Sequence, residues 1–141
     1  MKLKSLRIIS ERGGFYAGYD IKEYEQHLTI ASDGRIWFNA YGLSINDSWE
    51  KHRIRASRKS ISKESAFKIL NAAIEFLPSR IDHNTEIFDC DASPDKYTLR
   101  YEDGEIECGQ LWNNSEGVQK FYDTIRNELK IDNLLKFDYT F

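Results

Sequence analysis

Short runs of alternating apolar and polar residues, separated by turn signals, fill the first sixty residues of the chain. Alternation of this kind is typical of β-strands that bury one face. It predicts strands at residues 3–10, 24–31, 35–41 and 49–56. Asp33-Gly34 lies between the second and third strands and favours a tight hairpin turn, because such turns need positive φ angles. The fourth strand alternates least clearly, so we expect it at a sheet edge, where charged residues are tolerated.

The spacing of apolar residues becomes helical between residues 63 and 77. The large apolar residues there recur at steps of three and four, at Phe67, Leu70, Ile74 and Leu77, and the stripe is broadened by Ala66, Ile69 and Ala73. This spacing places them on one face of a helix, and we expect that face to pack against the core. Ser62 is a favourable N-cap, and Pro78 ends the helix because it lacks a backbone donor.

The second half of the chain again contains a hairpin followed by a helix. Its predicted elements are a short strand, the two strands of the hairpin and the helix, at residues 86–91, 97–102, 105–112 and 115–130. A two-residue Asp-Gly loop at 103–104 would pair Leu99 with Cys108 on one face. The same register would place Arg100 opposite Glu107 on the other face, where they form an opposite-charge pair.

These elements predict an α+β fold, in which an antiparallel sheet built from hairpins carries two amphipathic helices packed on one face. The length of 141 residues is that of one domain, so we expect a single α+β domain over residues 1–141. A hairpin and a helix occur at 24–77 and again at 97–130, which forms a weak hairpin-helix pseudo-repeat. This order of elements is similar to that of small bacterial proteins, but it rests on turns and periodicity and assigns no functional residue.

Composition excludes several classes of protein. Hydrophobic residues make up 40% and aromatic residues 13% of the chain, which argues against disorder. The formal net charge of -3 argues against a globally basic nucleic-acid coat protein. No apolar run approaches the ~20 residues that span a bilayer, and the first residues lack a signal-peptide core, so we expect a cytoplasmic protein without membrane partners. Cys90 and Cys108 lack the spacing of zinc or redox pairs, so we expect free, buried thiols.

Acidic residues are in excess in residues 82–107, where nine acids stand against Lys96 and Arg100. If the strand at 86–91 pairs beside the second hairpin, four carboxylates gather on one exposed face: Asp89, Asp91, Glu105 and Glu107. Such a face suits a basic protein partner. The alternative is an ordinary exposed sheet face that is kept soluble by its carboxylates. No spacing there matches a calcium loop, so we expect no metal.

Residues 51–63 show the opposite bias, with six basic residues and no acidic one. Four of these residues form the candidate polyanion-binding set: Arg53, Arg55, Arg58 and Lys59. Such a segment could neutralise the phosphates of a nucleic acid while nearby aromatic residues stack on its bases. The simpler alternative is a solvated edge strand whose charges prevent aggregation.

Aromatic residues gather around the first hairpin. If Ile36 and Phe38 point into the core, alternation along the strand turns Trp37 and Tyr41 to the other face. Exposed Trp and Tyr anchor many interfaces, so we predict an aromatic interface formed by Trp37, Tyr41 and Trp49. A neighbouring segment or a second copy of the chain in a homodimer would cover this face, and either would bury Trp37.

Motifs for catalysis or cofactor binding do not emerge from the sequence. His27, His52 and His83 have no metal-ligand spacing, and the glycines match neither a dinucleotide fingerprint nor a P-loop. We therefore expect no catalytic residue, no cofactor and no metal. The sequence favours an interaction protein of inhibitor or immunity type that binds a protein through its charged sheet surface. The alternatives are nucleic-acid binding by the basic segment and, less favoured, an enzyme whose site is assembled from distant strands.

Overall fold

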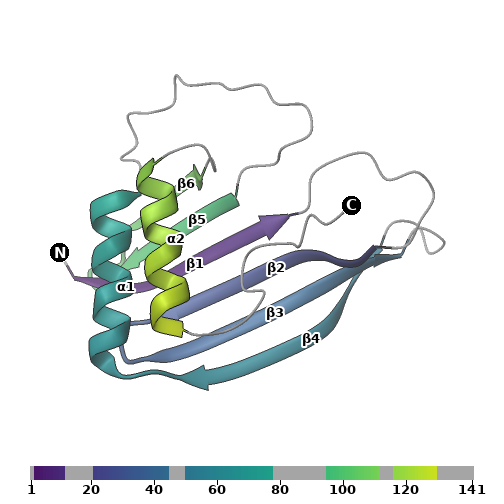
Figure 1. Ribbon diagram of the computed structural model, residues 1–141, viewed down its shortest axis with the longest axis horizontal. Helices are drawn as coiled ribbons and strands as arrows, with labels where there is room; N and C mark the ends of the chain where they lie inside the picture. The colour runs from purple at the N-terminus through teal and green to yellow at the C-terminus, as the bar shows by residue number, and fades with distance from the viewer. Residues whose placement is uncertain (1, 12–20, 45–49, 78–94, 112–115, 130–141) are drawn as a thin grey trace.

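Six strands pair into one antiparallel sheet in the computed structural model (Figure 1). The structure describes residues 2–11, 21–44, 50–77, 95–111 and 116–129. The strands are β1 (Leu3–Glu11), β2 (Ile21–Ala31), β3 (Arg35–Ser44), β4 (Glu50–Ser60), β5 (Asp95–Tyr101) and β6 (Ile106–Leu111). Their spatial order is β4-β3-β2-β1-β5-β6, and each pair of neighbours is antiparallel. Together with the helices α1 (Lys63–Phe76) and α2 (Glu116–Leu129), this sheet confirms the predicted α+β class.

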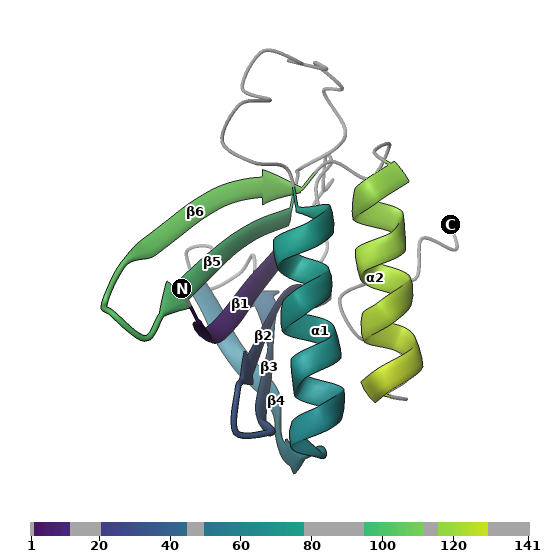
Figure 2. The same ribbon diagram turned by 90° about the vertical axis from the view of Figure 1, so that its left-hand side faces the viewer.

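The two helices lie side by side on one face of the sheet, as predicted (Figure 2). The core fills the space between this face and the helices. Its strand residues include Leu6, Ile8, Leu28, Ile30, Ile36, Phe38, Tyr97 and Leu99, and its helix residues include Ile69, Leu70, Ala73, Val118, Phe121 and Ile125. Successive strand residues point to opposite faces, so the residues between these strand positions point away from the helices. We call this second face, on which neither helix lies, the open face.

Helix α1 begins and ends close to the predicted positions. Ser62 is the N-cap, and its Oγ accepts a hydrogen bond of 3.0 Å from the backbone N–H of Ser65. The helix ends at Phe76, and the backbone N–H of Leu77 donates to the carbonyl oxygen of Ala73 at 3.1 Å. Satisfied terminal backbone groups of this kind are what a capping residue provides. The predicted N-cap is therefore confirmed.

The buried face of α1 agrees with the predicted one only in part. Phe67 and Ile74 are 63% and 52% exposed, although the spacing of large apolar residues predicts both in the core. The helix buries Ile69 and Leu70 of the predicted stripe together with three alanines, Ala66, Ala72 and Ala73. Alanines allow a helix to approach its neighbours closely, so the buried face is centred on them rather than on the bulkiest side chains. In α2, by contrast, all the large apolar residues are buried: Val118, Phe121, Tyr122, Ile125 and Leu129.

Both Asp-Gly hairpins have loops that are one residue longer than a two-residue turn. In the first, the N–H of Gly34 donates to the carbonyl of Ala31 at 3.0 Å, and in the second the N–H of Gly104 donates to that of Tyr101 at 3.1 Å. The glycines have φ angles of 95° and 93° and stand at the last loop position. Three-residue hairpin loops place a glycine in this left-handed conformation at that position. The two-residue loop predicted at 103–104 is therefore wrong.

The longer loop changes the register of β5 and β6 by one residue. Leu99 is opposite Glu107, Thr98 is opposite Cys108, and Arg100 is opposite Ile106. A shift of one residue turns every side chain of a strand to the other face. The predicted pairs of Leu99 with Cys108 and of Arg100 with Glu107 are consequently wrong. Cys108 is exposed rather than buried for the same reason.

Several predictions fall on residues that the structure does not describe. The strand predicted at residues 86–91 lies outside the described residues, and so do Cys90 and Trp49. Strand β4 begins at Glu50 and continues to Ser60, beyond the predicted end at residue 56. Within the described part of the chain, neither helix combines the length and the apolar character that crossing a bilayer requires.

Candidate functional site

The open face carries a ladder of opposed side chains where β3 meets the edge strand β4. Three pairs form it, each a Cα-register pair across the two strands: Trp37 with Arg58, Asn39 with Ala56, and Tyr41 with Arg53. Ile36, Phe38 and Ala40 of β3 point into the core, so alternation turns Trp37, Asn39 and Tyr41 to the open face, as predicted. We call these six residues the ladder. In it, each aromatic side chain of β3 has an arginine as its cross-strand neighbour.

A bulge in β4 produces this arrangement. Ala40 is opposite Arg55 and Tyr41 is opposite Arg53, so Ile54 is the extra residue in β4. An extra residue reverses the alternation of side chains beyond it, so Arg53 lies on the open face while Arg55 lies on the helix side. The guanidinium of Arg55 accordingly lies 4.8 Å from the centroid of the Phe38 ring, which belongs to the core.

The predicted polyanion-binding set is therefore divided between the two faces of the sheet. Arg53 and Arg58 share the open face, whereas Arg55 and Lys59 lie on the helix side, because Lys59 is opposite the buried Ile36. Their closeness in sequence does not bring the four residues onto one surface, since neighbouring strand residues alternate and the bulge separates Arg53 from Arg55.

Basic side chains outnumber carboxylates on the open face. The register places these basic residues on its strands: Arg7, Arg35, Lys51, Arg53, Arg58, Lys96 and Arg100. Among the side chains that the structure describes, its strand carboxylates are Glu11 and Glu25. The chain as a whole is acidic, with a net charge of -3, so this face departs from the average of the protein. A surface with one dominant sign of charge attracts ligands of the other sign.

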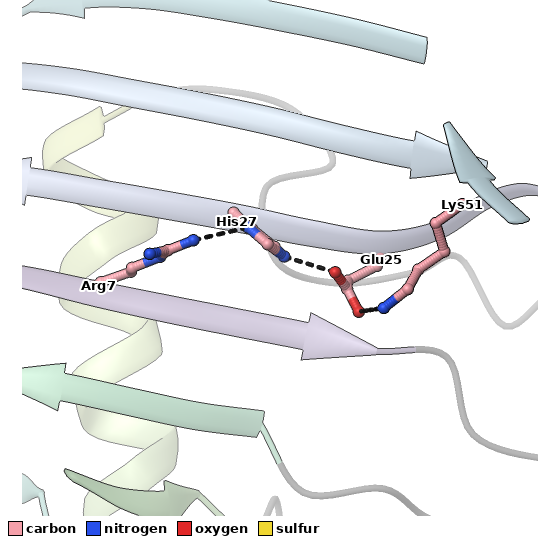
Figure 3. A network of polar contacts seen from close by, with 4 residues as sticks. All are labelled: Arg7, Glu25, His27 and Lys51. Carbon is pink, nitrogen blue, oxygen red and sulfur yellow. Dashed lines mark hydrogen bonds and ion pairs between the residues drawn. The ribbon is translucent and has the colours of Figure 1, made fainter. Parts of the chain in front are cut away.

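Beside the ladder, a network of four polar side chains crosses the sheet from β1 to β4 (Figure 3). Arg7 Nη2 lies 3.0 Å from His27 Nδ1, and His27 Nε2 lies 2.6 Å from Glu25 Oε2. The other carboxylate oxygen of Glu25 accepts a hydrogen bond of 2.9 Å from Lys51 Nζ. Glu25 is buried, so its carboxylate is satisfied by neighbouring side chains rather than by water.

The partners of His27 determine its tautomer. An arginine can only donate, so His27 Nδ1 must accept from Arg7 and the proton must be on Nε2, which donates to Glu25. Both ring nitrogens are then occupied. The ring also packs against Tyr41 of the ladder, with 4.8 Å between the two centroids. This arrangement makes His27 a positioning residue that holds the Tyr41 ring in place.

Two neighbouring carboxyl groups in the network have opposite pKa shifts. Burial alone would raise the pKa of Glu25, but hydrogen bonds from Lys51 and His27 outweigh burial and lower it. Burial raises the pKa of Glu11, as do its hydrogen bond with Glu25 and the charge of Glu25. The Glu25 carboxylate in turn raises the pKa of Lys51. Of the two carboxyl groups, Glu25 is thus the one that releases its proton more readily.

A second polar group is buried on the helix side of the sheet. Asp95 at the start of β5 accepts a hydrogen bond from the hydroxyl of Tyr122 on α2 and another from Ser10 on β1. Burial raises the pKa of Asp95, and the two hydrogen bonds oppose this rise only in part. The residue ties the sheet to α2, and both of its hydrogen-bond partners are themselves buried.

The predicted acidic face is only partly within the described residues. Asp89 and Asp91 lie outside them, and so does Trp49 of the predicted aromatic interface. Glu107 lies on the same face as its cross-strand neighbour Leu99, which is the helix side and not the open one. Trp37 is half-buried rather than buried, because neither helix lies on its face. The binding roles of these residues stay predictions.

Sequence reasoning missed the network around Glu25. Glu25 and His27 stand two residues apart on one strand, which signals a shared face, but Arg7 and Lys51 join them only through the strand order. Among the described residues, no group of three His, Cys, Asp or Glu side chains has an arrangement that could hold a metal ion. Comparisons of the chain with protein-family models, with curated proteins and with solved structures gave no match.

Proposed function

We propose that this chain is a binding protein whose ligand is an anionic macromolecule, and that it binds this ligand with the open face of its sheet. The proposal rests on the difference between the two faces of the sheet. The helices occupy one face, while basic side chains dominate the strands of the other. A cytoplasmic location is part of the proposal.

Free guanidinium groups on this face support the proposal. Glu25 is engaged by Lys51 and His27, and Asp33 forms an ion pair of 2.7 Å with Arg35. Arg53, Arg58 and Arg100 form no ion pair with another residue that the structure describes, and all three are exposed. Arginines without an ion-pair partner among the described residues are available to bind an external anion, for which their planar, multidentate donors are well suited.

The proposal keeps the class of function that the sequence favours, a binding protein that uses a charged sheet surface, but it changes the sign of the charge. The register places Glu107 on the helix side, so this carboxylate does not contribute to the open face. His27 has both ring nitrogens occupied, and this argues for a structural role of the network over acid–base chemistry.

Adjacent residues of β4 provide a matched test of this proposal. Arg58 and Lys59 differ by one position, are both exposed, and lie on opposite faces of the sheet. We expect Arg58→Glu to elute from immobilised heparin, a sulfated polyanion, at clearly lower salt than the unaltered chain. Lys59→Glu makes the same change in net charge on the helix side and should have a much smaller effect. Equal shifts for both variants, or no retention of the unaltered chain, would contradict the proposal.

A further inference from the structure

The ladder on β3 and β4 combines aromatic and cationic side chains. Trp37 and Tyr41 are aromatic and half-buried, while their cross-strand neighbours Arg58 and Arg53 are exposed cations. Between the two pairs lies Asn39, opposite Ala56, the smallest side chain of the ladder. Binding of an anion would need only the arginines, so the aromatic half of each pair calls for a separate explanation.

We infer that the anionic ligand is a single-stranded nucleic acid that lies along β3, with bases stacked on Trp37 and Tyr41 and phosphates bound by Arg58 and Arg53. Aromatic side chains that stack on bases, beside a basic track for the backbone, are the two features by which proteins bind single strands. The inference rests on the proposed function and names the ligand of the same face.

Spacing along β3 agrees with an extended single strand. Trp37 and Tyr41 are four residues apart, which corresponds to about 14 Å along a strand. Stacked nucleotides of a duplex advance only about 3.4 Å per step along each strand, so the two rings cannot receive adjacent bases of a stacked helix. They suit bases that are splayed apart. The amide of Asn39, which lies between the rings on the same face, can donate to and accept from a base edge.

Both rings are held by neighbouring polar side chains. The guanidinium of Arg35 lies 5.6 Å from the centroid of the Trp37 ring, and Asp33 fixes Arg35 through a hydrogen bond of 2.7 Å to Nε. The Tyr41 ring packs against His27, which the network of Arg7 and Glu25 holds in one tautomer. Rings that are positioned before binding lose less conformational freedom when a base stacks on them.

The bulge at Ile54 is what completes the second pair. Without the extra residue, strict alternation from Arg58 through Ala56 would place Ile54 on the open face and turn Arg53 toward the helix side. With it, Arg53 is opposite Tyr41 and Ile54 is the extra residue. Bulges commonly re-aim a side chain beside a functional site, and this one adds a cation to the open face.

An acidic protein is the competing ligand for a basic face. Its carboxylates would pair with Arg53 and Arg58, and with the exposed Arg100 on β5, without any use of the aromatic rings. A single-stranded nucleic acid would need both the arginines and the aromatic rings. The aromatic side chains therefore separate the two ligands experimentally, and Trp37 is the residue on which the test is built.

The test measures binding by fluorescence anisotropy at one moderate salt concentration. The labelled probes are oligouridylate and oligodeoxythymidylate of about 12 nucleotides, a duplex of the same length, inorganic polyphosphate and polyglutamate. The variants are Trp37→Leu, Tyr41→Leu, Arg58→Ala and, as the control on the helix side, Lys59→Ala. Thermal unfolding of each variant establishes that it is folded.

We expect both single strands to bind more tightly than the duplex. Trp37→Leu should weaken their binding roughly tenfold, as the loss of one stacked base does, and leave binding of polyphosphate unchanged. Tyr41→Leu should act in the same direction. Arg58→Ala should weaken binding of the single strands and of polyphosphate, whereas Lys59→Ala should weaken neither. A preference between the RNA and DNA probes would show which of the two the face selects.

Four results would overturn the inference, and they separate it from the proposed function. If Trp37→Leu and Tyr41→Leu leave single-strand binding unchanged, or if the duplex binds as well, base stacking is absent and only the anionic-ligand proposal survives. Tighter binding of polyglutamate than of the oligonucleotides would make the ligand an acidic protein. If none of the anionic probes binds, the proposed function itself fails.

A second measurement does not depend on the folding of a Trp37 variant. The chain has three tryptophans, so Trp49→Phe and Trp112→Phe together leave Trp37 as the remaining one. Oligouridylate should quench its fluorescence as a base stacks on the indole, whereas polyphosphate should not. Binding of the oligonucleotide without any change in Trp37 emission would contradict the inference.

Discussion

Glu25 on β2 and Lys51 on β4 meet across the intervening strand β3, with 2.9 Å between Oε1 and Nζ. The ion pair therefore joins two strands that are not neighbours in the sheet. Its carboxylate is buried, while the Lys51 side chain is 46% exposed. Because the same carboxylate also holds His27, this one contact connects the edge strand of the sheet to the residue that packs on Tyr41.

Replacing Glu25 should destabilise the protein. Glu25→Gln keeps the shape of the side chain but loses the charge that binds Lys51 and His27, and we expect a loss of about 1 kcal/mol in unfolding free energy at pH 7. The pKa of Glu25 is lower in the folded state than its ordinary value of 4.5. Its stabilising contribution is therefore present above pH 4.5 and is lost as the pH falls through the folded-state pKa. Urea unfolding at pH 7 and at pH 3.5 measures this, and an equal effect of the substitution at both values would contradict it.

Replacing Glu11, the cross-strand neighbour of Glu25, should have the opposite effect. The pKa of Glu11 is raised above 4.5, so its contribution to stability is present below pH 4.5 and is lost as the pH rises through the folded-state pKa. Glu11→Gln removes the repulsion from Glu25 and still offers a donor to it. We expect a gain of about 0.5 kcal/mol at pH 7, measured by the same urea titration. A loss of stability in this variant would contradict the raised pKa of Glu11.

Stability should also depend on pH through Asp95. Burial raises its pKa above the ordinary value of 3.8, so the unfolded chain ionises this group more readily than the folded one. The contribution of Asp95 is present below pH 3.8 and is lost as the pH rises through its folded-state pKa. The asparagine introduced by Asp95→Asn does not titrate. The stability of this variant relative to the unaltered chain should therefore increase as the pH rises from 3.8 through the folded-state pKa of Asp95. Thermal unfolding between pH 3.5 and pH 8 tests this, and a constant difference would contradict it.

Gly34 should tolerate alanine far less well than Gly104 does. Both have φ near 95° and share the cost of a left-handed alanine, which is about 1 kcal/mol. A Cβ at Gly34 would also overlap the carbonyl oxygen of Ile61, whereas a Cβ at Gly104 would meet no atom. Because that oxygen belongs to the backbone between β4 and α1, it cannot move aside easily. We expect a loss of about 3 kcal/mol or more for Gly34→Ala, and similar unfolding midpoints for the two variants would contradict this account.

Local sequence signals predict the helices, strands and turns of the fold. Which face of each element is buried depends on contacts between residues that are distant in the sequence. The capping role of Ser62 and the glycine turn at Gly34 depend on their immediate neighbours, so both were correct. The buried face of α1 depends on how closely the helix approaches the sheet, and spacing alone placed Phe67 wrongly in the core.

The candidate site was predictable only in part for the same reason. Trp37 and Tyr41 follow from alternation along one strand, which the sequence displays directly. The division of Arg53 from Arg55 depends on a bulge, and no residue of β4 marks that bulge in the sequence. The face of Glu107 depends on a single extra loop residue, which reverses a whole strand.

The central claim is that the open face, and not the helix side, binds the ligand. An NMR titration of the isotope-labelled protein with oligouridylate, which maps the chemical-shift changes, tests this claim most directly. We predict shifts of the Trp37 indole N–H and of the side chains of Arg53 and Arg58, with the resonances of Lys59 and of α2 unchanged. Shifts confined to the helices, or no shift at Trp37 under saturating oligonucleotide, would contradict the account.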